Sequence, residues 1–186
     1  MHADIAKKLF TVDEYYRMGE AGILDHTLRT ELINGEIIEM SPLGDRHMEC
    51  VNRANTVLVP ALMNRAIVSV QNAVRINNLT MPQPDLVLYK FRKDFYKGRH
   101  ESSDVLLLIE VSDSTFRYDR YVKLPLYASV GIREVWIEDL TNNRVAAFRD
   151  PAGKTYSTSL VFGAGESISP LAFPDMTIAI DEFLGL

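Results

Sequence analysis

The sequence predicts an α/β fold in which a mixed β-sheet is flanked by helices. An apolar run, a helical pattern and a second apolar run follow one another between residues 105 and 138, which is the order of a strand, a helix and a parallel strand. The first run is apolar enough for a central strand covered on both faces. Beyond residue 144, two strand patterns joined by a turn predict an antiparallel C-terminal section. A chain of 186 residues can build one substantial core, so one domain over residues 1–186 is expected.

The composition is that of a globular protein, with 47% hydrophobic and 24% charged residues, and it excludes disordered and fibrous classes. The apolar runs are too short to cross a membrane, and Met1 to Phe10 lacks the hydrophobic stretch of a signal peptide. We therefore expect a cytoplasmic protein with no membrane partner. A net charge of −5 disfavours a protein that coats nucleic acid, but it permits a nuclease whose acids surround metal ions. The one cysteine, Cys50, is expected to be buried.

Two elements are predicted before residue 41. Thr11 and Glu14 have the spacing of a capping box, so a short helix should begin after Thr11. Asn34-Gly35 lies between apolar pairs and predicts a β-hairpin over residues 29–40, because both residues tolerate the positive φ that the turn requires.

The remaining elements follow from hydrophobic periodicity. An amphipathic helix is predicted from Asp45, the expected N-cap, to about Asn64, and Pro60 should either kink it or split its last turn. A second helix is predicted over residues 119–130, with a break near its proline, and a last helical turn capped by Asp181. Strand patterns occupy six further segments: residues 66–78, 85–89, 105–111, 133–138, 144–148 and 156–160.

Two acidic residues interrupt the apolar strands in the middle of the chain. Asp85 begins one strand, and Glu110 lies near the end of the next. A carboxylate in an apolar run loses hydration unless a cation or hydrogen-bond donors compensate, so the pair suggests a shared hard cation. A lone acid of this kind is more often salt-bridged or at a strand edge. The order of Asp85, Glu110 and then Lys123 on the following helix adds weight, because phosphodiester cleavage requires positive charge near the developing negative charge.

Three further features admit two interpretations each. Glu31, in the hairpin, is either a solvated or salt-bridged strand acid or an auxiliary acid beside the metal. His47, in the first turn of the long helix, is either a partly exposed histidine or a contact to a phosphate near the helix N-terminus. The basic segment 90–99 is either a solvated loop or an insert next to the site that contacts phosphate rather than bases.

Short motifs in a fixed order run through most of the chain. They are ELINGE (31–36), MSP (40–42), His47, QPD (83–85), IEVSDST (109–115), YDR (118–120), KLPLYA (123–128) and Gly131-Ile132 before Trp136. As an ordered set they resemble the Uma-type restriction endonucleases of the PD-(D/E)XK nuclease superfamily. The sequence departs from the superfamily signature at Ser112, where a lysine would follow the glutamate by two positions. The resemblance implies that Lys123 supplies this lysine from the neighbouring helix.

The resemblance implies a restriction-endonuclease-like fold and a hydrolase, namely a metal-dependent endonuclease acting on DNA phosphodiester bonds. Asp85, Glu110 and the carbonyl of Val111 would bind Mg²⁺ or Mn²⁺, in keeping with oxygen ligands and the lack of Cys or His clusters. Lys123 would stabilise charge or help to deprotonate the attacking water.

Glu31 and His47 complete the set of candidate catalytic residues. Cutting both strands of DNA suits a two-fold symmetric homodimer. Two alternatives remain open: a catalytically silent DNA-binding or protein-interaction module of the same fold, and a hydrolase of another phosphate ester.

Overall fold

A six-stranded mixed sheet organises the computed structural model, which describes residues 6–25, 27–97 and 101–186. Its strands lie in sequence order: β3 (Ala66–Val70), β4 (Leu86–Lys90), β5 (Val105–Ser112), β6 (Glu134–Asp139), β7 (Arg144–Ala152) and β8 (Thr155–Phe162). The β5–β6 pair is parallel and the other pairs are antiparallel. The predicted α/β class, with its mixed sheet and antiparallel C-terminal section, is therefore confirmed.

The crossover between the two parallel strands is an irregular helix. It consists of α3 (Phe116–Tyr118), a π-helical turn (Asp119–Lys123) and α4 (Leu124–Ser129). The Leu124 N–H donates to the Asp119 carbonyl, five residues back, so the turn is wider than an α-helical one. The break predicted near Pro125 is thus the π-helical turn that ends at Lys123, two residues before a proline that has no N–H to continue the regular helical hydrogen bonds.

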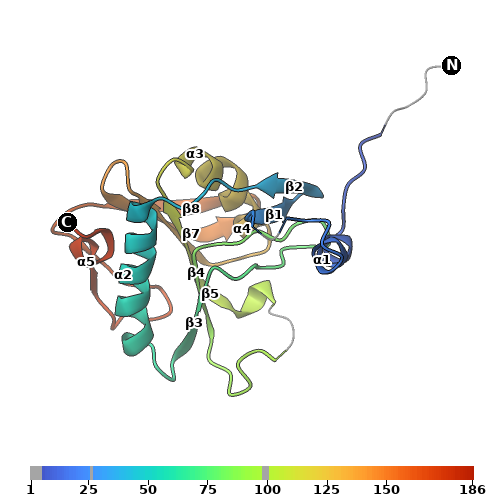
Figure 1. Cartoon of the computed structure of the whole chain (residues 1–186). Helices are drawn as coiled ribbons and strands as arrows, with labels where there is room; N and C mark the ends of the chain where they lie inside the picture. The colour runs from blue at the N-terminus through green and yellow to red at the C-terminus, as the bar shows by residue number, and fades with distance from the viewer. Residues whose placement is uncertain (1–5, 26, 98–100) are drawn as a thin grey trace.

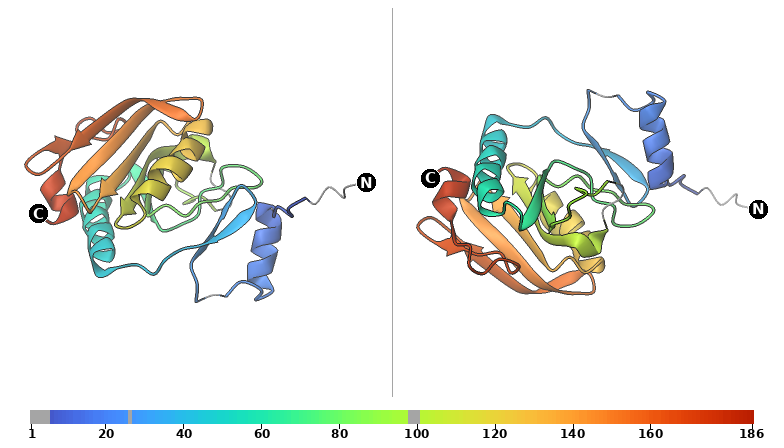
Figure 2. Two further views of the ribbon diagram at one scale, coloured as in Figure 1. Left: turned by 90° about the horizontal axis from the view of Figure 1, so that it is seen from above. Right: turned by 90° about the horizontal axis from the view of Figure 1, so that it is seen from below.

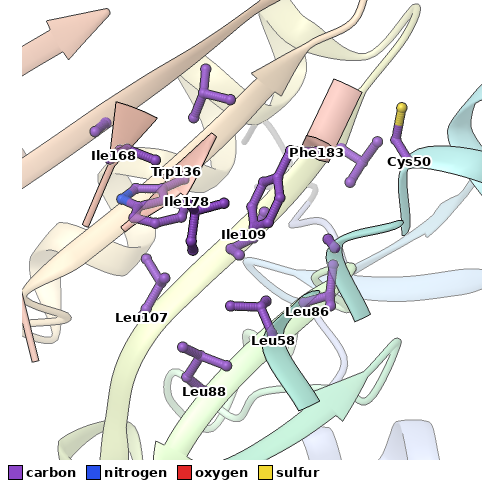
Figure 3. Close-up of a cluster of buried hydrophobic side chains, with 14 of the residues drawn as sticks. Cys50, Leu58, Leu86, Leu88, Leu107, Ile109, Trp136, Ile168, Ile178 and Phe183 are labelled. Atoms are coloured by element: carbon purple, nitrogen blue, oxygen red, sulfur yellow. The ribbon is translucent and has the colours of Figure 1, made fainter. Parts of the chain in front are cut away.

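Helices cover both faces of the sheet (Figure 1). The helices α2 (Asp45–Ala61) and α5 (Ile180–Leu184) pack together on one face, and α4 contacts β7 and β8 on the other (Figure 2). Because side chains alternate along a strand, β4 and β5 contribute to a core on each side. The α2 side holds Cys50, Leu58, Leu86, Ile109, Trp136 and Phe183, which Figure 3 shows packed together. The α4 side holds Val87, Leu108, Tyr127, Val135 and Phe148.

The N-terminal elements lie beside the main sheet (Figure 2). They are α1 (Val12–Glu20) and the hairpin of β1 (Thr30–Ile33) and β2 (Glu36–Glu39). The predicted capping box is present, and the hairpin turn has positive φ at Asn34 (51°) and Gly35 (81°). A small core of Val12, Leu32 and Met81 joins the hairpin to the segment before β4.

Several predicted boundaries are wrong. The strand expected over residues 66–78 ends at Val70, because Gln71 adopts a positive φ of 52°. Helix α2 starts with Asp45 inside it and Gly44 as the N-cap, and it ends at Ala61, just after Pro60. The last helix, α5, follows Ala179 as its N-cap, so Asp181 does not cap it.

The C-terminal segment adds a small antiparallel sheet of β9 (Ser167–Ile168) and β10 (Ile178–Ala179). In the described part of the chain, no helix has the length and apolar character needed to span a membrane.

Candidate active site

A cleft of about 70 Å³ lies where β5 ends. The main functional candidates line it: His47, Asp85, Glu110, Val111 and Lys123. Asp85 directly precedes β4, and Glu110 and Val111 lie near the end of β5. Because β4 and β5 are antiparallel, with Leu86 opposite Ile109, the start of one strand lies beside the end of the other. This register brings the two acidic residues into one cleft.

Asp85 is held by hydrogen bonds on both oxygens. Its Oδ2 accepts from the Val111 N–H at 2.9 Å and lies 3.2 Å from His47 Nε2, and its Oδ1 accepts from the Gln71 amide at 3.4 Å. These contacts fix the orientation of the side chain, and only 5% of Asp85 is exposed. His47 is itself 8% exposed, so its interpretation as a partly exposed helix residue is wrong.

Lys123 lies at the centre of a group of acidic side chains. Its Nζ is 3.3 Å from Glu31 Oε2, 3.4 Å from Glu110 Oε1 and 3.5 Å from Asp119 Oδ1. Burial alone would lower the pKa of Lys123, but the carboxylates of Glu110, Glu31 and Asp119 raise it above its ordinary value. Lys123 therefore keeps its positive charge in an interior position.

Glu110 receives a short hydrogen bond from the Tyr127 hydroxyl, 2.5 Å from its Oε1. Burial raises the pKa of Glu110 well above its ordinary value; Lys123 opposes this shift, and the charges of Asp119 and Asp85 add to it. Several carboxyl groups share one ammonium here, and a divalent cation beside Glu110 would favour its charged form against the effect of burial.

Glu31 enters the cluster from the hairpin. Its Oε2 accepts from the Gln83 N–H at 3.1 Å and contacts Lys123, and only 1% of the residue is exposed. It is therefore a salt-bridged acid, not a solvated one, and its salt bridge is with the candidate catalytic lysine.

Asp119 and Tyr127 contact the candidate residues but were not predicted as part of the site. Asp119 Oδ2 accepts from Ser112 Oγ and from Thr115 Oγ1, each at 2.7 Å. Ser112, at the signature lysine position, thus reaches Lys123 through Asp119. The signal in the sequence was the spacing, because residues four positions before and after Lys123 share its face of a helix.

The described part of the basic segment, residues 90–97, does not lie next to this cleft. It follows the far end of β4, and a five-residue strand at about 3.4 Å per residue places it roughly 17 Å from Asp85. The reason is that β4 and β5 form a hairpin whose connection is opposite the acidic residues. Lys90 donates to the Ser103 carbonyl and Arg92 pairs with Asp94, while Arg99 lies outside the described residues.

No group of three or more His, Cys, Asp or Glu side chains is arranged around a common metal position within residues 6–25, 27–97 and 101–186. Lys123 instead lies among the carboxylates of the cluster. The predicted ligands nevertheless line the cleft together: Asp85 and Glu110 offer carboxylate oxygens there, and Val111 lies beside them. One or two carboxylates completed by main-chain oxygen and water are the ligand set that Mg²⁺ commonly uses. The residues therefore fit a hard divalent cation of this class.

Comparison with known proteins supports the fold and identifies the family. The structure is similar to a crystal structure of a "putative nuclease belonging to DUF820" from Anabaena variabilis, with a TM-score of 0.66 and 17% sequence identity. The match covers 95% of this chain and 98% of that protein's chain. A comparison with curated proteins finds no match. A family model described as "Putative restriction endonuclease" matches residues 12–181. This chain therefore belongs to the Uma2 family of restriction-endonuclease-like proteins.

Proposed function

We propose that this protein is a metal-dependent endonuclease that hydrolyses DNA phosphodiester bonds. The observation that carries the proposal is the meeting of Asp85, Glu110 and Lys123 in one cleft, although they come from the residue before β4, from β5 and from the helical crossover. Fold stability does not require this arrangement, because burying several carboxylates around one lysine costs more desolvation than an apolar core of the same volume.

The residues of the cleft have separable tasks in this proposal. Asp85, oriented by the Val111 N–H, and Glu110, oriented by Tyr127, present oxygen atoms that would hold Mg²⁺ or Mn²⁺. A bound ion of this kind supplies Lewis-acid activation of water and stabilises charge on phosphoryl oxygens. Lys123 provides a permanent positive charge for the negative charge that develops on the phosphate.

Glu31 and His47 act through their neighbours. Glu31 restrains Lys123 through their salt bridge, and His47 faces Asp85 Oδ2 with its Nε2. Direct contact between His47 and a phosphate stays a prediction. Cleavage of both strands would need two such clefts, so the proposal includes a two-fold symmetric homodimer, which light scattering of the purified protein would detect.

One observation favours a catalytically silent module as the rival function. The ammonium of Lys123 already balances part of the carboxylate charge, so the cluster can exist without an added ion. A silent module would bind its partner equally well in a chelator and in Mg²⁺. The enzyme, in contrast, depends on the ion for turnover.

The test is incubation of the purified protein with supercoiled, linear and single-stranded DNA in Mg²⁺, in Mn²⁺ and in EDTA. We expect cleavage of at least one DNA form with either ion and none in EDTA. Cleavage that persists in EDTA would contradict the metal dependence. Intact DNA under every condition, with metal-independent DNA binding, would identify the silent module.

A further inference from the structure

Arg29 lines the same cleft from the N-terminal hairpin, outside the cluster of side chains around Lys123. Its guanidinium makes no hydrogen bond or ion pair with any residue that the structure describes. Lys123, the other basic side chain that is always charged in this cleft, contacts three carboxylates and is 2% exposed. Of these two charged side chains, Arg29 is therefore the one whose N–H groups are available to a ligand.

The hairpin backbone fixes where Arg29 lies. Its carbonyl accepts from the Met40 N–H at 2.8 Å, which continues the β1–β2 ladder by one pair beyond Thr30 and Glu39. The next residue, Thr30, is anchored by the Tyr15 hydroxyl, 2.9 Å from its carbonyl oxygen. This backbone position is thus held by contacts to both α1 and β2.

Residues two apart on an extended strand share a face, so Arg29 lies on the same face as Glu31. Glu31 reaches Lys123 in the interior, whereas Arg29 is only partly buried. The same strand therefore supplies a buried acid to the cluster and an accessible base to the cleft.

The charge of the cleft indicates what this base would bind. Four carboxylates line the cleft: Asp85, Glu110, Asp113 and Asp119. An incoming phosphodiester is also negative, and Lys123 is already paired, so a guanidinium in the cleft lowers the repulsion that the phosphate meets, in addition to any bound divalent ion. A guanidinium presents parallel N–H groups that match two phosphate oxygens, which an ammonium cannot do.

We propose that Arg29 binds the non-bridging oxygens of a DNA phosphate as it enters the cleft. This inference rests on the proposed function, because the phosphodiester substrate defines the ligand. Arg29 thereby acts as a substrate-binding residue that is independent of the metal ligands.

The test uses Arg29→Met and Arg29→Lys, with Arg133→Met as the matched control. Arg133 is exposed and precedes β6, at the end of the sheet opposite the cleft. DNA binding is measured by fluorescence anisotropy in Ca²⁺ over a range of salt concentrations. Arg29→Met should weaken binding and reduce the magnitude of the slope of log K against log salt by about 0.7–0.9, the value for one lost phosphate contact. Arg29→Lys should restore the slope but only part of the affinity, and Arg133→Met should match the wild type.

A second measurement identifies the phosphate. A single neutral methylphosphonate is moved along the DNA, and binding by the wild type and by Arg29→Met is compared at each position. At the contacted phosphate, the wild type should lose affinity and the variant should not. Equal salt slopes for wild type and Arg29→Met, or equal losses at every methylphosphonate position, would overturn the inference.

The outcome for Arg29 can be separated from the outcome for the proposed function. Arg29 is tested by binding in Ca²⁺, whereas the endonuclease proposal is tested by cleavage in Mg²⁺ or Mn²⁺. If Arg29→Met reduces the salt slope but the wild type cuts no DNA, the endonuclease proposal is overturned and the Arg29 contact is supported. If the wild type cuts DNA but Arg29→Met has the same salt slope as the wild type, the Arg29 contact is overturned and the endonuclease proposal is supported. Thermal unfolding and Mn²⁺ titration of each variant show that the fold and the ion site are intact.

Discussion

Lys123 has its ammonium 3.3–3.5 Å from the carboxylates of Glu31, Glu110 and Asp119. Ser112, which stands at the signature lysine position, has its hydroxyl 2.7 Å from the same Asp119 carboxylate. A side chain from position 112 and one from position 123 therefore converge on one carboxylate. This convergence gives a physical basis for a lysine that is supplied from the helix instead of from the strand.

Lys123→Ala should lower the turnover rate at saturating DNA by about 10²-fold or more, the scale for loss of a positioned electrostatic or proton-transfer group, with little change in DNA binding in Ca²⁺. Lys123→Arg should rescue poorly, because a guanidinium cannot reproduce the point charge of the ammonium. Removing the ammonium also leaves buried carboxylates unpaired, which typically costs about 3–5 kcal/mol. Urea unfolding must therefore accompany the assay, and wild-type turnover in a folded Lys123→Ala would contradict the assignment.

The control for that loss is the double variant Ser112→Lys/Lys123→Ala. It returns a lysine to the cluster from the strand, into the space that Lys123 leaves, so turnover should rise above that of Lys123→Ala alone. Ser112→Lys without the second change should overpack the site and cost about 1–3 kcal/mol of stability. A double variant that folds and gains no activity would show that a lysine from position 112 does not reach the same place.

At the scale of elements, the sequence was sufficient where local pattern determines structure. The capping box, the Asn34-Gly35 turn and the strand, helix and strand order all follow from residues near one another in the chain. The meeting of Asp85 and Glu110 was also predictable, because consecutive apolar strands commonly pair.

The rest of the site depends on geometry that the local pattern does not contain. The π-helical turn sets where Lys123 points, and a wide turn has no distinct residue signature. The basic segment was misplaced because sequence proximity to Asp85 does not say which end of a hairpin carries the connection. In the sequence, Tyr127 has the spacing of a core residue of its helix, and only the tertiary contact with Glu110 indicates its role.

For the molecule as a whole, the buried side chain of Glu138 on β6 lowers the stability of the folded state. Both of its carboxylate oxygens are buried without a hydrogen-bond partner in the described chain, and the residue is completely covered. Burial, and then the charge of Asp85, raises the pKa of Glu138 well above its ordinary value.

The free energy of unfolding depends on pH because the folded and unfolded chains bind different numbers of protons at Glu138. Above about pH 4.3 the unfolded chain releases this proton while the folded chain keeps it, so the free energy of unfolding falls as pH rises, by up to about 1.4 kcal/mol per unit. Glu138→Gln cannot titrate. Its stability relative to the wild type should therefore increase from pH 5 to pH 7, measured by urea unfolding in EDTA. A stability difference that is constant over this range would contradict the buried, protonated state of Glu138.

Calorimetric titration with Mn²⁺ shows whether Asp85 and Glu110 form a site for a divalent cation. The comparison is between the wild type and Asp85→Asn, which removes one charge with little change of shape, with thermal unfolding in EDTA as the control for the fold. We expect the wild type to bind Mn²⁺ and a folded Asp85→Asn to lose that binding, while its stability without the ion is unchanged or raised because like charges no longer repel. Equal Mn²⁺ affinity in the two proteins would show that Asp85 is not a ligand, and no Mn²⁺ binding by the wild type would show that Asp85 and Glu110 form no divalent-cation site.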